Sequence, residues 1–226
     1  MNIAGLTPFS SIDFEGRISA VIYTQGCNFH CVYCHNYHLI NRKNTSFSLE
    51  SLFEFIKFRR RILDSVVISG GEPTLHRDLP NFCEQLKKLR LSVKLDTNGS
   101  SPLMLKLLAS KGLIDYIAMD IKAPFHKYKK IINSEFPTEI IKASMEFIKS
   151  SNIPHEFRTT VHSELLSLSD LEKIIQLAGS PAHKLCAGLY FQLTQPTPLF
   201  KAPNKYTKET LNTFIGKFPG FKLALR

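Results

Sequence analysis

Short apolar segments alternate with longer amphipathic segments along most of the chain. Six of the short segments are rich in β-branched residues and have the length and composition of β-strands. We predict strands at 18–24, 65–69, 92–96, 116–121, 155–161 and 189–194. Between them, apolar residues recur with helical spacing. This spacing predicts helices, two of them capped by Asp78 and Ser101, over 49–61, 78–90, 101–110, 135–150, 168–178 and 207–218.

The alternation of strand and helix predicts an α/β fold. Strands joined by helices run parallel, with right-handed crossovers. The sequence shows no fixed-length repeat, no low-complexity segment and no linker. We therefore expect one domain over residues 1–226, with a core at about 17–200 and a last helix at about 207–218. Six strand–helix units fit either a doubly wound sheet or a partly closed barrel, and periodicity does not separate the two.

Polar residues and glycines gather where the predicted strands end. In both α/β architectures, ligands bind at the carboxyl ends of parallel strands. A cysteine-rich loop follows the first predicted strand. The other strands end in or near Gly70-Gly71-Glu72-Pro73, Asp96-Thr97-Asn98-Gly99, Asp120, Lys122, Arg158, Gln192 and Gln195. Because these ends meet at one edge of the sheet, their polar groups predict an active site there.

Composition is that of an ordinary globular protein, with 226 residues of which 43% are hydrophobic and 21% charged. No run of about 18 apolar residues occurs, and the amino terminus lacks the pattern of a signal peptide. We therefore expect a cytoplasmic protein with reduced thiols and no membrane partner. The net charge is +10, but the basic runs at 57–61 and 127–130 fit a solvated helix face and a loop. Without an RNA-binding motif, nucleic acid is not an expected partner.

Three of the five cysteines, Cys27, Cys31 and Cys34, fall within eight residues, and His35 follows directly. Reduced thiols disfavour a disulfide, haem attachment to C-x-x-C-H needs export, and a redox pair of Cys31 and Cys34 leaves Cys27 unused. A zinc site stays open, although neighbouring residues do not easily face one ion. Three thiolates on one loop favour a cubane iron–sulfur cluster with one open iron. The two remaining cysteines are interpreted as ordinary buried thiols: Cys83 and Cys186.

The spacing Cys27-x3-Cys31-x2-Cys34 after the first of six strands, together with the GGEP sequence at 70–73, resembles the radical S-adenosylmethionine (SAM) enzymes. The resemblance covers nearly the whole chain. It implies an oxidoreductase with a partial (β/α)6 barrel and a [4Fe-4S] cluster held by the three cysteines. It also implies SAM as second cofactor, bound to the open iron and split by an electron into methionine and a 5′-deoxyadenosyl radical.

Narrower motifs are similar to those of the activating enzymes of glycyl-radical proteins. They are Cys34-His35-Asn36, DTNG at 96–99, MDIK at 119–122 and the segment 12–17, where Glu15 replaces the family's usual proline. In length and pattern the chain most resembles activating proteins of anaerobic ribonucleoside-triphosphate reductase. The implied reaction removes a hydrogen atom from a backbone glycine of a large partner enzyme. A flavodoxin- or ferredoxin-type protein is the implied electron donor.

Two other activities stay open. One is activation of another glycyl-radical enzyme, such as pyruvate formate-lyase. The other is a small-molecule radical SAM reaction, such as that of 7-carboxy-7-deazaguanine synthase. The latter family usually reads Cys-Asp-Thr after its last cluster cysteine, where this chain has Cys34-His35-Asn36.

The resemblance also implies which residues contact SAM, and it implies no catalytic side chain beyond the cluster and SAM. The methionine amino group is expected beside Gly70, Gly71 and Glu72, and the methionine end of SAM also beside Asp96. The carboxylate is expected at Lys122 and the ribose at Asp120, with Gln195 in place of a ribose-contacting histidine. The residues expected around the adenine are Tyr33, His35 and Asn36.

Overall fold

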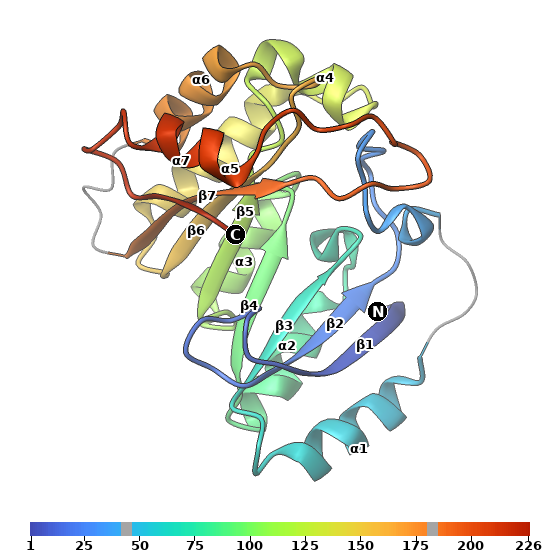
Figure 1. Cartoon of the computed structure of the whole chain (residues 1–226). Coiled ribbons are helices and arrows are strands. Elements are labelled where there is room, and N and C mark those ends of the chain that lie inside the picture. The colour runs from blue at the N-terminus through green and yellow to red at the C-terminus, as the bar shows by residue number, and fades with distance from the viewer. Residues whose placement is uncertain (42–46, 180–184) are drawn as a thin grey trace.

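A computed structural model describes residues 1–41, 47–179 and 185–226. Its strands form one eight-stranded sheet in chain order, in which β1 is antiparallel to β2 and every other neighbouring pair is parallel (Figure 1). The strands are β1 (Ile3–Ser10), β2 (Ser19–Thr24), β3 (Ser65–Gly70), β4 (Ser92–Thr97), β5 (Tyr116–Asp120), β6 (His155–Val161), β7 (Cys186–Leu193) and β8 (Leu223–Leu225).

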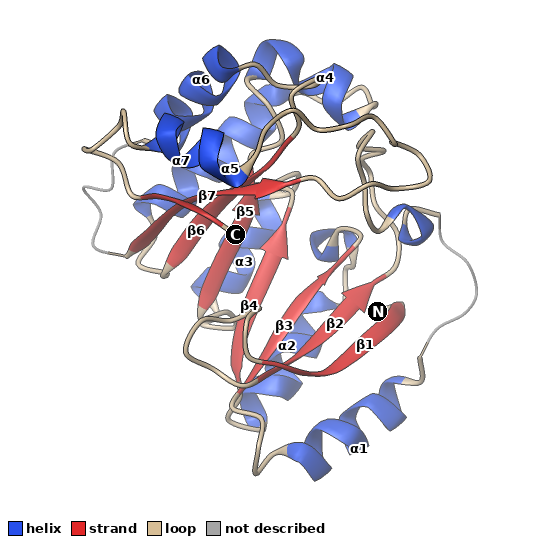
Figure 2. Cartoon of the chain, in the orientation of Figure 1, coloured by secondary structure: helices blue, strands red, loops and turns tan. Residues whose placement is uncertain are grey.

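Seven α-helices accompany the sheet in the described residues, together with two short 3-10 helices (Figure 2). The α-helices are α1 (Leu49–Arg59), α2 (Leu79–Lys88), α3 (Pro102–Ser110), α4 (Phe125–Ile132), α5 (Thr138–Ser150), α6 (Leu168–Ala178) and α7 (Lys208–Ile215). The 3-10 helices are η1 (Tyr37–Leu39) and η2 (Pro73–Leu75).

All six predicted strands are present, as β2 to β7, and the α/β prediction is confirmed. The two edge strands were not predicted. β1 contains Gly5 and Pro8, and both residue types are rare in strands, so its sequence does not have the composition typical of a strand. β8 has only three residues, too few to show a strand pattern. The basic run at 127–130 was predicted as a loop, which is wrong: it lies in α4.

Two details of the predicted helices are also wrong. Neither Asp78 nor Ser101 caps its helix with a side-chain hydrogen bond. The Asp78 carboxylate instead pairs with the amino group of Met1. The last helix is shorter than the predicted 207–218 and ends at Ile215.

The two faces of the sheet differ in chemistry. Side chains alternate between the faces along each strand. The outer face carries Ile22, Ile68 and Leu95, which belong to the large apolar core shared with the helices. The inner face carries Val21 and Val67, which form a separate small cluster with Phe14, Tyr23 and Tyr116. The helices therefore cover the outer face of the sheet, and the inner face remains available for polar groups.

Buried charges line the inner face below the strand ends. The Lys94 ammonium donates to the carbonyl oxygen of Asp13 at 2.6 Å and to the Glu156 carboxylate at 3.3 Å. Lys94 and Glu156 are only 2% and 1% exposed. The segment between β1 and β2 thus closes the amino-terminal end of the sheet interior.

The sheet stays open, because its order begins with β1 and ends with β8.

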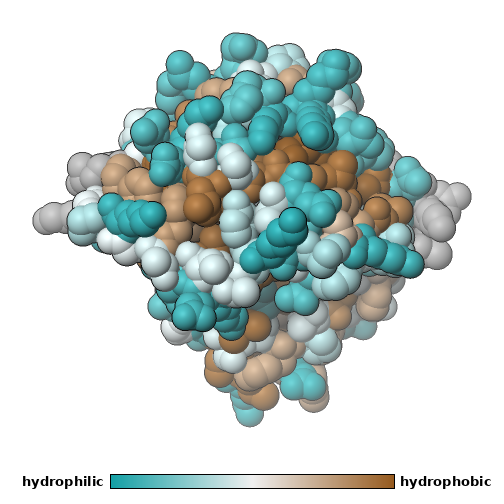
Figure 3. Space-filling model, turned by 45° about the horizontal axis from the view of Figure 1, so that its top comes forward, coloured by the Kyte–Doolittle hydropathy of each residue, from teal (hydrophilic) through white to brown (hydrophobic). Residues whose placement is uncertain are grey.

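In the view that brings the top of Figure 1 forward, apolar side chains gather in a band across the middle of the face, with hydrophilic ones around them (Figure 3). In the described part of the chain, no helix is long and apolar enough to cross a membrane.

Two glycines bring the end of β3 against the loop that follows β2. The amide of Gly71 donates to the carbonyl of Thr24 at 2.9 Å, and the amide of Glu72 donates to the carbonyl of Gly26 at 2.9 Å. Gly70 has a φ of +112°, and a Cβ there would lie 2.3 Å from the Thr24 nitrogen. A Cβ on Gly71 would lie 2.1 Å from the Gly26 oxygen. Backbone packing alone therefore requires glycine at both positions.

We predict that Gly71→Ala lowers the free energy of unfolding by roughly 1–3 kcal/mol, because backbone must move away from the new methyl group. Urea denaturation of the protein without cofactors measures this. Gly5→Ala is the matched control, since its Cβ meets Tyr23 at an ordinary 3.6 Å. Equal stability of the two variants would contradict the packing argument.

Candidate active site

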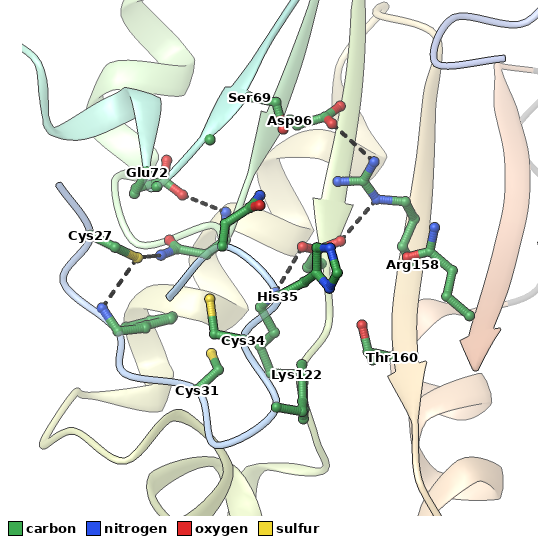
Figure 4. A pocket seen from close by; sticks show the side chains of 18 of the residues that line it. Cys27, Cys31, Cys34, His35, Ser69, Glu72, Asp96, Lys122, Arg158 and Thr160 are labelled. Carbon is green, nitrogen blue, oxygen red and sulfur yellow. Dashed lines mark hydrogen bonds and ion pairs between the residues drawn. The ribbon is translucent and has the colours of Figure 1, made fainter. Parts of the chain in front are cut away.

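A pocket of about 450 Å³ opens at the carboxyl ends of the parallel strands. The three cysteines and the ten other residues predicted for the site all line it (Figure 4). They are Cys27, Cys31, Tyr33, Cys34, His35, Asn36, Gly70, Gly71, Glu72, Asp96, Asp120, Lys122 and Gln195. The structure thus brings together residues that lie up to 168 positions apart, from Cys27 to Gln195.

The cysteine loop is attached to the end of α4. The amides of His30 and Val32, which flank Cys31, donate to the carbonyls of Ile132 and Ile131 at 2.8 and 3.1 Å. These carbonyls have no partner within their own helix, as at any helix end. The loop therefore receives its shape from a helix about one hundred residues later in the chain.

The three thiols face the pocket from a poorly solvated loop (Figure 4). Burial raises the pKa of Cys27 to about 12 and that of Cys31 to about 11, and it also raises the pKa of Cys34. The free thiols are therefore protonated near neutral pH, and a metal group that binds them must displace their protons.

In the described part of the chain, no three His, Cys, Asp or Glu side chains lie close enough to hold one metal ion. A cubane cluster bonds each thiolate to a different iron, so its ligands stand further apart than those of a single ion. Three thiols around one pocket suit such a cluster.

The two other cysteines lie outside the pocket lining. Cys83 is fully buried in α2, as predicted. Cys186 was predicted to be a buried thiol before a strand, which is wrong: it is the first residue of β7 and is partly exposed.

Arg158 joins the carboxylates of two neighbouring strands. Its guanidinium donates to Asp120 at 2.9 Å and to Asp96 at 3.1 Å, and Lys122 donates to the other Asp120 oxygen at 2.8 Å. Burial disfavours the charged forms, but the neighbouring groups, with the Asp120 carboxylate first among them, together outweigh it and raise the pKa of Lys122 and Arg158. In turn, burial raises the pKa of Asp120, and the two cations more than offset that rise and hold it at about 2. The site therefore contains fixed, paired charges.

Glu72 is fully buried and acts as a structural acceptor. Its carboxylate accepts hydrogen bonds from the amide and hydroxyl of Thr74, the hydroxyl of Thr97 and the amide of Asn98. Burial raises its pKa, and these hydrogen bonds oppose that rise. Glu72 thus ties the loop after β3 to the end of β4, a role that its place in the GGEP motif did not indicate.

Two buried acceptor or donor atoms in the pocket lining lack a hydrogen-bond partner among the described residues: Asp96 Oδ1 and the Tyr33 hydroxyl. The Lys94 ammonium lies 3.9 Å from Asp96 Oδ1, too far for a hydrogen bond. Such atoms are costly to leave unsatisfied in a protein interior. They fit a ligand that brings a cationic donor and a further polar group.

The rim of the pocket holds the more exposed predicted residues. His35 and Gln195 are exposed, and Asn36 is partly exposed. His162, the histidine at the end of β6, bonds the Ala202 carbonyl and does not line the pocket. Asn98, expected at a strand end within the DTNG motif, also lines the pocket. The missed lining residues include Thr160 and Arg226, and Arg226 carried no sequence signal.

A sequence profile described as "Radical SAM superfamily" matches residues 21–178. The chain belongs to the radical SAM superfamily. Enzymes of this family use a [4Fe-4S] cluster and SAM, so both predicted cofactors are confirmed at the level of the family.

Individual relatives carry the names of different radical SAM enzymes. A Methanocaldococcus jannaschii protein named "Putative glycyl-radical enzyme activating enzyme MJ1227" is 36% identical over 177 residues, 76% of this chain and 73% of that protein. The 7-carboxy-7-deazaguanine synthase of Aquifex aeolicus is 36% identical over 97 residues, 41% of this chain and 43% of that enzyme.

The fold also has solved counterparts. Streptococcus suis SuiB, crystallised with its precursor peptide SuiA, superposes with a TM-score of 0.73 at 15% identity. The alignment covers 91% of this chain and 48% of SuiB, so this radical SAM chain spans about half the length of that protein. The likeness confirms the partial barrel.

The residues present fit both cofactors. Three thiols of one loop match a cluster that keeps one iron free, and Asp96 Oδ1 offers an unused acceptor for the amino group of SAM. Gly70 and Gly71 also line the pocket beside the cysteine loop.

We predict that Glu72→Gln destabilises the cofactor-free protein by roughly 1–3 kcal/mol, because an amide nitrogen cannot accept the hydrogen bonds that the carboxylate accepts. Thermal and urea denaturation measure the loss. Glu84→Gln, on the exposed face of α2, should leave stability nearly unchanged. If Glu72→Gln were as stable as the parent, Glu72 would have only a ligand-binding role.

The contribution of Asp120 to stability should disappear in acid. An unfolded Asp titrates near pH ~3.9, whereas in the folded protein the pKa of Asp120 is about 2. Because the folded value is depressed, this contribution is complete above about pH 4 and is lost as the pH falls towards 2. Its size is roughly 2 kcal/mol. Urea denaturation across this range measures it.

The comparison variant for this pH series is Arg158→Gln, which removes the main cation beside Asp120. Its acid-induced loss of stability should begin at a higher pH than that of the parent. Identical pH profiles for the two proteins would show that Arg158 does not set the protonation of Asp120.

Proposed function

We propose that this chain is the activating enzyme of a glycyl-radical enzyme. It cleaves SAM reductively at a [4Fe-4S] cluster and removes a hydrogen atom from a backbone glycine of a partner enzyme. The proposed partner is an anaerobic ribonucleoside-triphosphate reductase, and the proposed electron donor is a flavodoxin- or ferredoxin-type protein in the cytoplasm. The observation that carries the proposal is the three-thiol loop over a pocket with an unsatisfied Asp96 carboxylate oxygen.

The cluster would be held by Cys27, Cys31 and Cys34. When bound, the cluster and SAM supply the one-electron chemistry that removes a hydrogen atom. Asp96 would accept the amino group of SAM through its free oxygen, and Lys122 would direct an N–H towards the carboxylate.

The other site residues would bind and orient the nucleoside part of SAM. Asp120 would accept from the ribose, while Arg158 and Lys122 keep its carboxylate charged. Tyr33, His35 and Asn36 would border the adenine, with Gln195 at the rim near the ribose.

Two features support a protein substrate. The relative from M. jannaschii carries the name of an activating enzyme and aligns with most of this chain. Apolar side chains gather in a band on the face shown in Figure 3, and an exposed apolar band is suited to contact with another protein. A backbone glycine needs no side-chain pocket, only access to the bound SAM.

The second candidate is a small-molecule reaction of the 7-carboxy-7-deazaguanine synthase type. The A. aeolicus relative favours it, but the match covers 97 residues only. The reading Cys34-His35-Asn36 after the cluster cysteines argues against it.

We expect the protein, reconstituted anaerobically with iron and sulfide and reduced with dithionite, to convert SAM into 5′-deoxyadenosine. Cys31→Ala should abolish the product, because the cluster would lose a ligand. Cys83→Ala, a buried thiol away from the pocket, should retain it. Chromatographic quantification of 5′-deoxyadenosine is the measurement. A cluster-loaded, reduced wild-type protein without product would contradict the proposal.

The partner is tested by adding an anaerobic ribonucleotide reductase to the same mixture. Electron paramagnetic resonance (EPR) should detect a glycyl radical on it, and replacing its radical glycine by alanine should remove the signal. A radical on pyruvate formate-lyase instead would reassign the partner. Turnover of a pterin-like compound in the absence of both partner proteins would favour the small-molecule reaction.

A further inference from the structure

Asn98 links three loops of the site. It is 5% exposed and lies between the end of β4 and Gly99. Its amide N–H donates to Glu72 at 2.6 Å, which fixes its backbone against the loop after β3. Its side-chain Nδ2 donates to Asn28 Oδ1 at 3.0 Å and to the sulfur of Cys27 at 3.9 Å.

The orientation of the Asn98 amide is determined by its neighbours. Its Oδ1 accepts from the backbone amide of Ser100 at 2.9 Å, and that amide can only donate. The NH2 group therefore points to the other side, where Asn28 Oδ1 and the Cys27 sulfur lie. An NH2 group has two hydrogens, enough for both acceptors.

Cys27 has one more donor. The backbone amide of Phe29 donates to its sulfur at 3.4 Å. Backbone amides also interact with the other two sulfurs, that of Asn36 with Cys34 and that of Cys31 with its own sulfur. Among the described residues, Cys27 is the one of the three thiols that receives an N–H from a side chain in addition to one from the backbone.

Hydrogen bonds to cysteine sulfur change the electronics of an iron–sulfur cluster. Reduction adds negative charge to the cluster and its ligands, and an N–H aimed at a sulfur stabilises that charge. Such a contact raises the reduction potential, which makes the cluster easier to reduce.

We propose that Asn98 is a positioning residue that tunes the reduction potential of the cluster through its N–H contact with Cys27. The inference rests on the proposed ligation of a cluster by Cys27. Glu72 has an indirect part, because it holds the backbone from which the Asn98 side chain projects. The GGEP and DTNG motifs thus act on the cluster, besides lining the pocket.

Two variants separate this electronic role from packing. Asn98→Leu has similar volume but no donor. Asn98→Asp keeps an oxygen for the Ser100 amide and replaces the donor by a negative charge. The midpoint potential, measured by EPR-monitored anaerobic titration, should be highest in the wild type, more negative in Asn98→Leu and most negative in Asn98→Asp. Ser100→Ala removes only the hydroxyl contact to Asn28 at 3.4 Å and should leave the potential unchanged.

An Asn98→Leu protein with a full cluster and the wild-type potential would overturn the inference and leave the proposed function intact. Absence of iron, sulfide and any cluster signal in the wild type would overturn the proposed function itself. Iron and sulfide analysis of every sample distinguishes the two failures.

A wild-type measurement decides the matter if the variants lose their cluster. Protein labelled with ¹⁵N only in the side-chain amides of asparagine, reduced and examined by pulsed EPR, should show a ¹⁵N coupling to the cluster. The coupling should persist in Asn28→Ser, which removes another asparagine of this contact group. Absence of any asparagine coupling would overturn the inference.

Discussion

The ion pairs that Arg158 makes with Asp96 and Asp120 are the interaction on which the site depends. They join β4, β5 and β6 on the inner face of the sheet. Each carboxylate would be unstable there alone, because burying an unpaired charge is expensive. With Arg158 between them, both carboxylates are paired, the pKa of Asp120 is held at about 2, and Asp96 Oδ1 keeps no hydrogen-bond partner among the described residues. The same contact that stabilises the barrel interior therefore prepares it to receive a cationic ligand group.

Much of the architecture could be predicted from the sequence, because the parallel strands are short apolar segments with clear boundaries and the helices between them have helical spacing of apolar residues. The six central strands and the residues around the pocket follow from that periodicity and from the motifs. The misses have local causes. β1 contains Gly5 and Pro8, and α4 combines a run of lysines with only eight residues. Contacts between distant segments, such as Arg226 reaching the pocket, leave no local pattern to detect.

The residues of the GGEP motif also stabilise the fold, besides the contacts with SAM that the family resemblance implies. Gly70 and Gly71 are required because their backbones touch Thr24 and Gly26, whether or not a ligand is present. Glu72 uses its carboxylate to join two loops. Loss of activity after substitution at these positions therefore combines lost folding with lost binding. Stability measured without cofactors is the way to separate the two effects.

The attachment of the cysteine loop to α4 has a consequence for biosynthesis. The amides of His30 and Val32 depend on carbonyls of Ile132 and Ile131, which leave the ribosome about a hundred residues later. Until then the three thiols belong to an unshaped segment, open to stray metal ions and oxidants. Productive loading with iron and sulfide must follow the synthesis of α4. The sequence separation between the cysteine loop and α4 therefore sets the order of the two events.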